Sequence, residues 1–292
     1  MRKMAIAALA ASLAFIAPGI ASAKIAGTVS IGYEHSSYDY DNSYYDGEGY
    51  FSCYYCEDHE QGPTLSASIV GPLMGDGPWI IQGDAQLVSE TEHYDHESYK
   101  SHDSVGHVAA HVAYRTEAYT VGAFYGMEND HGSDVQEIGI EAQKYFDNFT
   151  LQGSVAYGDH QNSCSGCQDD YNAWAVNAGG TYYFNDTWSA SANVGYAEFD
   201  YGYSASTELT TVGVAGEYRV PNTNFSVRAA YTYGDASDTY VDYTSNTFQV
   251  GLVIDLGSGS ARERDREGAS LNGATAFDQQ WRLWEPNYYG VS

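Results

Sequence analysis

The segment Thr247-Phe-Gln-Val-Gly-Leu-Val-Ile-Asp-Leu256 determines how the rest of this chain is interpreted. Every second residue from Phe248 to Leu256 is apolar, while the residues between them include Gln249, Gly251 and Asp255. A period of two predicts a β-strand with one apolar face and one face that tolerates polar groups. Because the same pattern recurs along the chain, we expect this segment to be the last strand of a membrane β-barrel, paired with the first.

About twelve segments show this alternation, and each is near the 9–11 residues or so that a tilted membrane-spanning strand needs. An even number of antiparallel strands is typical of bacterial membrane barrels. The predicted strands are 24–33, 64–72, 78–88, 105–115, 118–127, 136–146, 149–158, 173–184, 187–198, 208–220, 224–233 and 246–256.

The connections alternate between short turns, such as Asp147-Asn148 and Asn185-Asp186, and long polar loops, such as 34–63 and 89–104. Short turns on one side and long loops on the outer side are typical of an outer-membrane barrel. A soluble β-sandwich or a secreted barrel would show the same alternation along its strands. The even strand count, the loop asymmetry and the aromatic residues at strand ends favour the membrane barrel.

Strand parity also predicts which side chains face the lumen. The inward positions include carboxylates that would oppose arginines across a constriction and so create a transverse field. The candidate pore-lining residues are Asp84, His107, His111, Arg115, Glu137, Glu141, Glu217, Arg219 and Arg228.

Residues 24–256 resemble the porin-like outer-membrane β-barrels of Gram-negative bacteria. The last strand is similar to the assembly signal of that class at Gln249, Gly251, Ile254 and Leu256, although it ends on Leu and is followed by more chain. The resemblance implies an all-β, up-and-down barrel in the outer membrane. It also implies three partners: the barrel-assembly machinery, outer-membrane lipid and lipopolysaccharide. It does not specify a substrate.

The first 23 residues have the layout of a secretory signal peptide, with Arg2 and Lys3, an apolar run and Ala21-Ser22-Ala23. Without them, 10 basic residues remain against 39 acidic ones, a formal charge of −29. Nucleic acid is therefore not an expected partner. The loop 34–63 has no lysine or arginine, and we expect it to concentrate cations at the barrel mouth, divalent ones among them.

The four cysteines form two C-x-x-C pairs, Cys53/Cys56 and Cys164/Cys167, in two predicted outer loops. Export to an oxidising compartment favours disulfides over a four-sulfur zinc site. The bonds either close each pair or join the two loops. His93 and His96 could bind a metal loosely, but we predict no metal site and no cofactor.

We expect no enzymatic activity. His131-Gly-Ser133 has the His-x-Ser spacing of the outer-membrane phospholipase, but no oriented base is evident beside it. The favoured hypothesis is a narrow channel for passive diffusion of small polar solutes, with a preference for cations. The alternative is a closed barrel that acts as a surface scaffold, adhesin or metal-binding protein through its loops.

Residues 257–292 follow the last strand, and strand parity predicts a periplasmic tail. Its mixed charges predict a short helix. Its aromatic end could plug the lumen or touch the cell wall.

Overall fold

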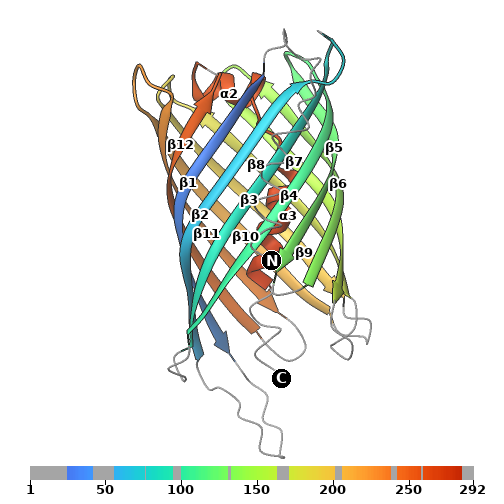
Figure 1. Cartoon of the computed structure of the whole chain (residues 1–292), viewed down its shortest axis with the longest axis vertical. Helices are drawn as coiled ribbons and strands as arrows, with labels where there is room; N and C mark the ends of the chain where they lie inside the picture. Colours follow the sequence, from blue (N-terminus) through green and yellow to red (C-terminus); the bar gives the residue numbers. More distant parts are fainter. Residues whose placement is uncertain are drawn as a thin grey trace, which may run out of the picture.

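The computed structural model describes residues 25–41, 56–75, 77–94, 100–130, 133–162, 171–200, 206–237, 242–257 and 259–284. Twelve antiparallel strands form a closed barrel (Figure 1). The strands are β1 Ala26–Asp41, β2 Cys56–Pro72, β3 Trp79–Tyr94, β4 Lys100–Arg115, β5 Tyr119–Asp130, β6 Ser133–Phe146, β7 Phe149–Asn162, β8 Tyr171–Tyr183, β9 Trp188–Asp200, β10 Ser206–Arg219, β11 Phe225–Ser237 and β12 Asp242–Leu256.

Every predicted strand is present. The main difference is at the long-loop end, where several strands continue beyond the predicted limit. β1 runs to Asp41 and β2 begins at Cys56, so much of the predicted loop 34–63 belongs to strands. The added residues are polar, and they continue the ladder because backbone pairing does not require an apolar face.

The first and last strands close the barrel, as expected from the alternation in 247–256. Thr28 of β1 lies opposite Asp255 of β12, and Glu34 lies opposite Gln249. These four residues are on the inward parity of their strands. The closed sheet leaves no unpaired edge, which a bilayer would not tolerate.

The outer surface carries an apolar belt between two levels of aromatic residues. On three successive strands the aromatic pairs lie eight positions apart: Phe149 and Tyr157, Trp174 and Tyr182, Trp188 and Tyr196. Eight residues span about 27 Å along a strand, and strand tilt lowers this to about 20 Å, close to the roughly 25 Å band of such barrels. Large side chains between these levels, such as Ile138 and Ile140, are 60% and 63% exposed and face lipid.

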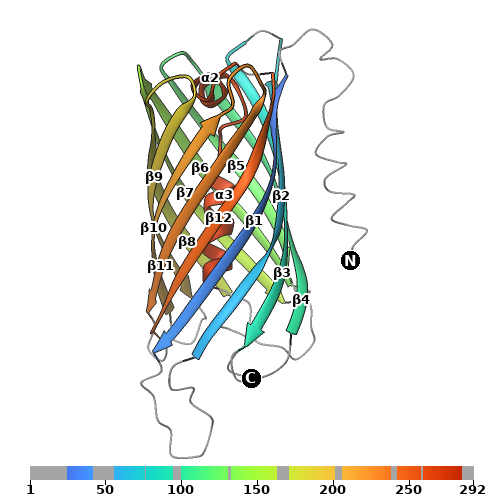
Figure 2. The same cartoon turned by 90° about the vertical axis from the view of Figure 1, so that its left-hand side faces the viewer.

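The chain after β12 turns into the barrel. Helix α2, Ala261–Glu267, lies at the short-turn end, and α3, Gly273–Trp284, runs down the lumen (Figure 2). We call residues 259–284 the plug. Strand parity predicts a periplasmic tail whose aromatic end plugs the lumen or touches the cell wall. The structure places residues 259–284 in the lumen, where the barrel interior holds matching polar and apolar surfaces for them. Among the described residues, no helix is long and apolar enough to span a membrane.

Candidate functional site

At the short-turn end, arginines of the plug and the wall share two carboxylates. Arg264 of α2 lies 2.6 Å from Glu217 of β10 and 3.2 Å from Asp255 of β12. Arg219 of β10 also pairs with Asp255. Burial opposes the positive charge of Arg264, but Glu217 and Asp255 outweigh burial and raise its pKa above the ordinary value. The plug therefore enters the barrel through a charge-matched contact.

Between the helices, wall side chains bind the main chain of the plug. Gln82 of β3 donates to the Leu271 carbonyl at 2.6 Å and accepts from the Leu271 amide at 3.2 Å. Gln143 of β6 donates to the Ser270 carbonyl at 2.8 Å, and Arg115 of β4 donates to the Gly268 carbonyl at 2.9 Å. These contacts satisfy backbone groups that would otherwise be buried without partners.

A chain of polar contacts then continues across the wall. The Gly273 amide, at the start of α3, donates to Glu141 of β6 at 2.9 Å. Glu141 lies 2.5 Å from Nδ1 of His111 on β4, and Nε2 of His111 lies 2.7 Å from Asp84 on β3. His111 is fully buried. The imidazole of His111 on β4 thus links α3, β6 and β3. Such a network is rigid when each of its polar groups has a partner.

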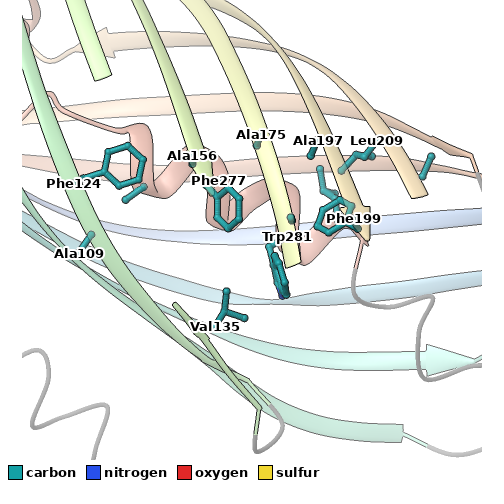
Figure 3. Packing of buried hydrophobic residues seen from close by; sticks show 14 of the residues in the cluster. Ala109, Phe124, Val135, Ala156, Ala175, Ala197, Phe199, Leu209, Phe277 and Trp281 are labelled. Atoms are coloured by element: carbon teal, nitrogen blue, oxygen red, sulfur yellow. The ribbon is translucent and has the colours of Figure 1, made fainter. Parts of the chain in front are cut away.

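The long-loop half of the lumen contains an apolar surface that faces α3. Phe124 of β5 and Phe199 of β9 pack with Phe277 and Trp281 of α3, among alanines of the wall (Figure 3). Trp281 is fully buried, and its ring lies 5.5 Å from that of Phe199. Gly158 of β7 makes room for α3, because a Cβ there would lie 2.4 Å from Cζ of Phe277.

The other end of α3 is held by charge. Arg282 lies 3.0 Å from Glu34 of β1, 3.6 Å from Glu90 of β3 and 3.4 Å from Asp278 one turn earlier. Burial opposes the charge of Arg282, but the three carboxylates raise its pKa well above the ordinary value. Burial would raise the pKa of Asp278, whereas the charges of His107 and Arg282 lower it below the ordinary range.

A cavity of about 410 Å³ remains beside the plug. α3 contacts β5 to β8 and β10, so it lies off the barrel axis, and strands β1, β2, β11 and β12 all contribute to the cavity lining. Hydroxyl and amide side chains are the most numerous kind in the lining. These include Thr28, Ser30, Ser66, Ser68, Gln86, Gln152, Asn177, Thr181, Ser189, Ser191, Asn193 and Gln249.

A second, water-sized pocket of about 10 Å³ continues toward the long-loop end. Glu34, Thr247, Gln279 and Arg282 line both spaces. We call these four residues the partition. The ion pair between Arg282 and Glu34 crosses it, so opposed charges do meet at a narrow point of the lumen, although one of them comes from the plug.

The structure places all nine predicted pore-lining residues on inward positions of the strands, but it pairs them differently from the sequence hypothesis. Glu217 does lie opposite Arg228 on the neighbouring strand, but Asp84 and Glu141 flank His111, and Glu137 lies 3.0 Å from His107. Four of the nine line the cavity, and the other five contact the plug or a neighbouring wall residue. The cavity-lining four are Asp84, His107, Glu217 and Arg228.

The sequence analysis missed the plug contacts, although two signals were present. Phe124 and Phe199 lie on the inward parity of strands whose other inward residues are small or polar. In the tail, Ala274, Phe277, Trp281 and Trp284 recur at three- and four-residue intervals, the pattern of a helix with one apolar face.

Several predicted residues lie outside the described part of the chain. They are Cys53, Cys164, Cys167, His96 and His131, together with the side chains of Cys56, His93 and Ser133. The disulfide and loop-metal hypotheses therefore stay predictions. Among the described residues, no group of three or more histidine, cysteine, aspartate or glutamate side chains could hold a metal ion.

Comparison with solved structures agrees with the fold. The chain is similar to an outer membrane channel from Pseudomonas putida F1, with a TM-score of 0.60, 13% identity and coverage of 82% of this chain and 100% of that one. A FadL homologue from Pseudomonas aeruginosa gives a TM-score of 0.47 at 11% identity, covering 80% of this chain and 90% of that one. The translocator domain of the autotransporter NalP from Neisseria meningitidis gives a TM-score of 0.49 at 12% identity, covering 85% of this chain and 96% of that one.

No family model and no curated protein matches the sequence. The closed barrel, its lipid-facing belt and the structural likeness agree on one architecture. The chain has the fold and the apolar outer surface of a Gram-negative outer-membrane β-barrel protein.

Proposed function

We propose that the protein is an outer-membrane channel for small polar solutes, in which the solute passes beside the plug. The observation that carries this proposal is the polar cavity next to α3, which the partition separates from the long-loop side. Hydroxyl and amide groups can replace the water around a polar solute, so a path lined by them lowers the barrier to crossing an apolar bilayer.

A preference for cations follows from the distribution of charge along the barrel axis. Carboxylates gather on the strand ends that lead to the long loops, and we call this set the acidic rim. The basic side chains described on the strands, including Arg115, Arg219 and Arg228, lie nearer the short-turn end. Such a mouth attracts cations and repels anions within about 8–10 Å. The rim comprises Asp39, Glu60, Glu90, Glu128, Asp159, Glu198, Asp200, Glu208, Asp235 and Asp242.

Conductance in planar bilayers tests the channel. The full chain should give small single-channel currents, and Arg282→Gln should increase them because the ion pair across the partition is lost. Arg262→Gln is the control, since within the described residues the one ion pair of Arg262 is a 3.8 Å contact to the exposed Asp186. Under a potassium chloride gradient, the reversal potential should favour potassium. A reversal potential that favours chloride would contradict the cation preference. If neither the full chain nor Arg282→Gln gives any current, the channel proposal is wrong.

The second candidate is a closed barrel that serves as a surface scaffold. The apolar packing of Phe277 and Trp281 against the wall favours this candidate, because a helix packed in this way is costly to displace. A scaffold predicts no conductance from either protein in the same experiment, while the barrel remains folded.

A further inference from the structure

Arg228 is an unusual cation within the lumen. It lies on β11, faces the cavity and remains accessible to water there. Within the described residues its guanidinium makes no hydrogen bond and no ion pair. Its cross-strand neighbour Glu217 is engaged by Arg264 at 2.6 Å. A guanidinium offers several donors in a plane that matches a carboxylate, so Arg228 can bind an anionic group in the cavity.

Asp265 supplies the opposite charge. It lies on α2, lines the same cavity and makes no ion pair within the part of the chain described. Its carboxylate lies beside the hydroxyl of Tyr183, while its Oδ2 atom is buried without a hydrogen bond. A carboxylate in this position can accept hydrogen bonds from an ammonium group.

The remaining charges at this end of the lumen neutralise one another. Arg219 pairs with Asp255, and Arg264 bridges Asp255 and Glu217. The cavity is therefore left with one cation and one anion that form no ion pair within the described residues. Glu217 acts on Arg228, and Arg115 on Asp265, only through longer-range electrostatic attraction, and both charges are set among neutral hydroxyl and amide groups.

We propose that this cavity binds a small zwitterion that carries one carboxylate and one ammonium group, as an amino acid or a short peptide does. Arg228 takes the carboxylate, and Asp265 takes the ammonium. The inference rests on the proposed function and specifies the solute for the same path. A volume of about 410 Å³ lies within the usual range of small-molecule sites. A solute without net charge also passes the acidic rim without the repulsion that an anion meets.

Uptake into proteoliposomes containing the full chain tests the site. The probes are glycylglycine, its N-acetyl form, which keeps only the carboxylate, and its C-terminal amide, which keeps only the ammonium. Xylitol, which is neutral, reports whether the channel passes solutes at all. Glycylglycine should enter about tenfold faster than either blocked form, since each blocked form lacks one of the two charge-assisted contacts.

Two variants separate the roles. Arg228→Gln should abolish the advantage over the amide, and Asp265→Asn should abolish the advantage over the N-acetyl form. Lys144→Gln is the control, because it removes a positive charge from the exposed outer face of β6. Isothermal titration of glycylglycine into the solubilised protein should show affinity that Arg228→Gln lowers about tenfold.

Entry of xylitol without a preference for glycylglycine would overturn the zwitterion site and leave the proposed channel standing. If xylitol does not enter, the channel proposal is wrong, and the isothermal titration of glycylglycine then tests the zwitterion site by itself. Absence of binding, or equal binding by Arg228→Gln, overturns the site in that case.

Discussion

Gln82 of β3 and Leu271 of the plug exchange two hydrogen bonds, one in each direction, at 2.6 and 3.2 Å. The side-chain amide of Gln82 thus pairs with a main-chain amide and carbonyl as a neighbouring strand would. The barrel recognises the plug at this point through its backbone conformation.

Replacing Gln82 by alanine should weaken plug docking by about 1–3 kcal/mol, because two buried backbone groups of Leu271 lose their partners. Hydrogen exchange of residues 259–284 should accelerate, while exchange of the strands stays slow. Gln152→Ala is the matched control, since Gln152 faces the cavity and makes no hydrogen bond within the described residues. Equal exchange in the two variants would show that Gln82 does not hold the plug.

Gly158→Ala should also loosen α3. The new Cβ would lie 2.4 Å from Cζ of Phe277, and overpacking of this kind costs about 1–3 kcal/mol. Gly216→Ala adds the same methyl group where nothing lies within 4 Å, and it should leave exchange of α3 unchanged. Shortening the opposing side chain in Gly158→Ala/Phe277→Leu should restore protection. If the double variant exchanges as fast as the single one, the contact with Phe277 is not the cause.

The barrel was predictable because its strands obey one local rule. Outward residues must be apolar to meet lipid, so the alternation in segments such as 247–256 gives both the strand and its orientation. The extension of β1 to Asp41 could not be predicted in this way. Beyond the bilayer, polar residues occupy both faces of the strand, so no apolar and polar alternation marks it and only backbone pairing continues it.

The site was less predictable, because its partners are far apart in the sequence. Gln82 and Leu271 are separated by 189 positions, and nothing near Gln82 in the sequence indicates that it binds a tail. Parity gave the inward direction of His111 and Glu141 but not their shared contact, since inward residues can face water, a plug or each other. The aromatic residues of the tail indicated a plug as one of two alternatives. Matching Phe199, an aromatic residue on a polar face, to Trp281 of an amphipathic tail would have favoured the lumen over the cell wall.

Arg264→Gln should destabilise the short-turn end of the barrel. Asp255 would keep its ion pair with Arg219, but Glu217 would keep none among the described residues, and a buried carboxylate without its partner costs about 3 kcal/mol. We expect the temperature at which the protein loses its compact electrophoretic form to fall. Arg262→Gln, whose charge is exposed, should have almost no effect. Equal transition temperatures in the two variants would contradict a role for Arg264 in anchoring the plug.

Plug docking should depend on acid through Asp278. Burial alone would raise the pKa of this carboxyl, but the charges of His107 and Arg282 lower it below the ordinary 3.8. A pKa depressed in the docked state means that ionised Asp278 stabilises docking above pH 3.8, and that this contribution is lost as the pH falls through the lower, docked value.

Protection factors of α3, which divide out the intrinsic pH dependence of exchange, should therefore hold from pH 7 to about pH 4 and fall below it. Asp278→Asn should lower protection at neutral pH and flatten the acid response, because the Arg282 contact no longer depends on a titrating group at that position. Glu263→Gln, on the exposed side of α2, should keep the response of the unmodified protein. A full acid response in Asp278→Asn would show that Asp278 is not the group responsible.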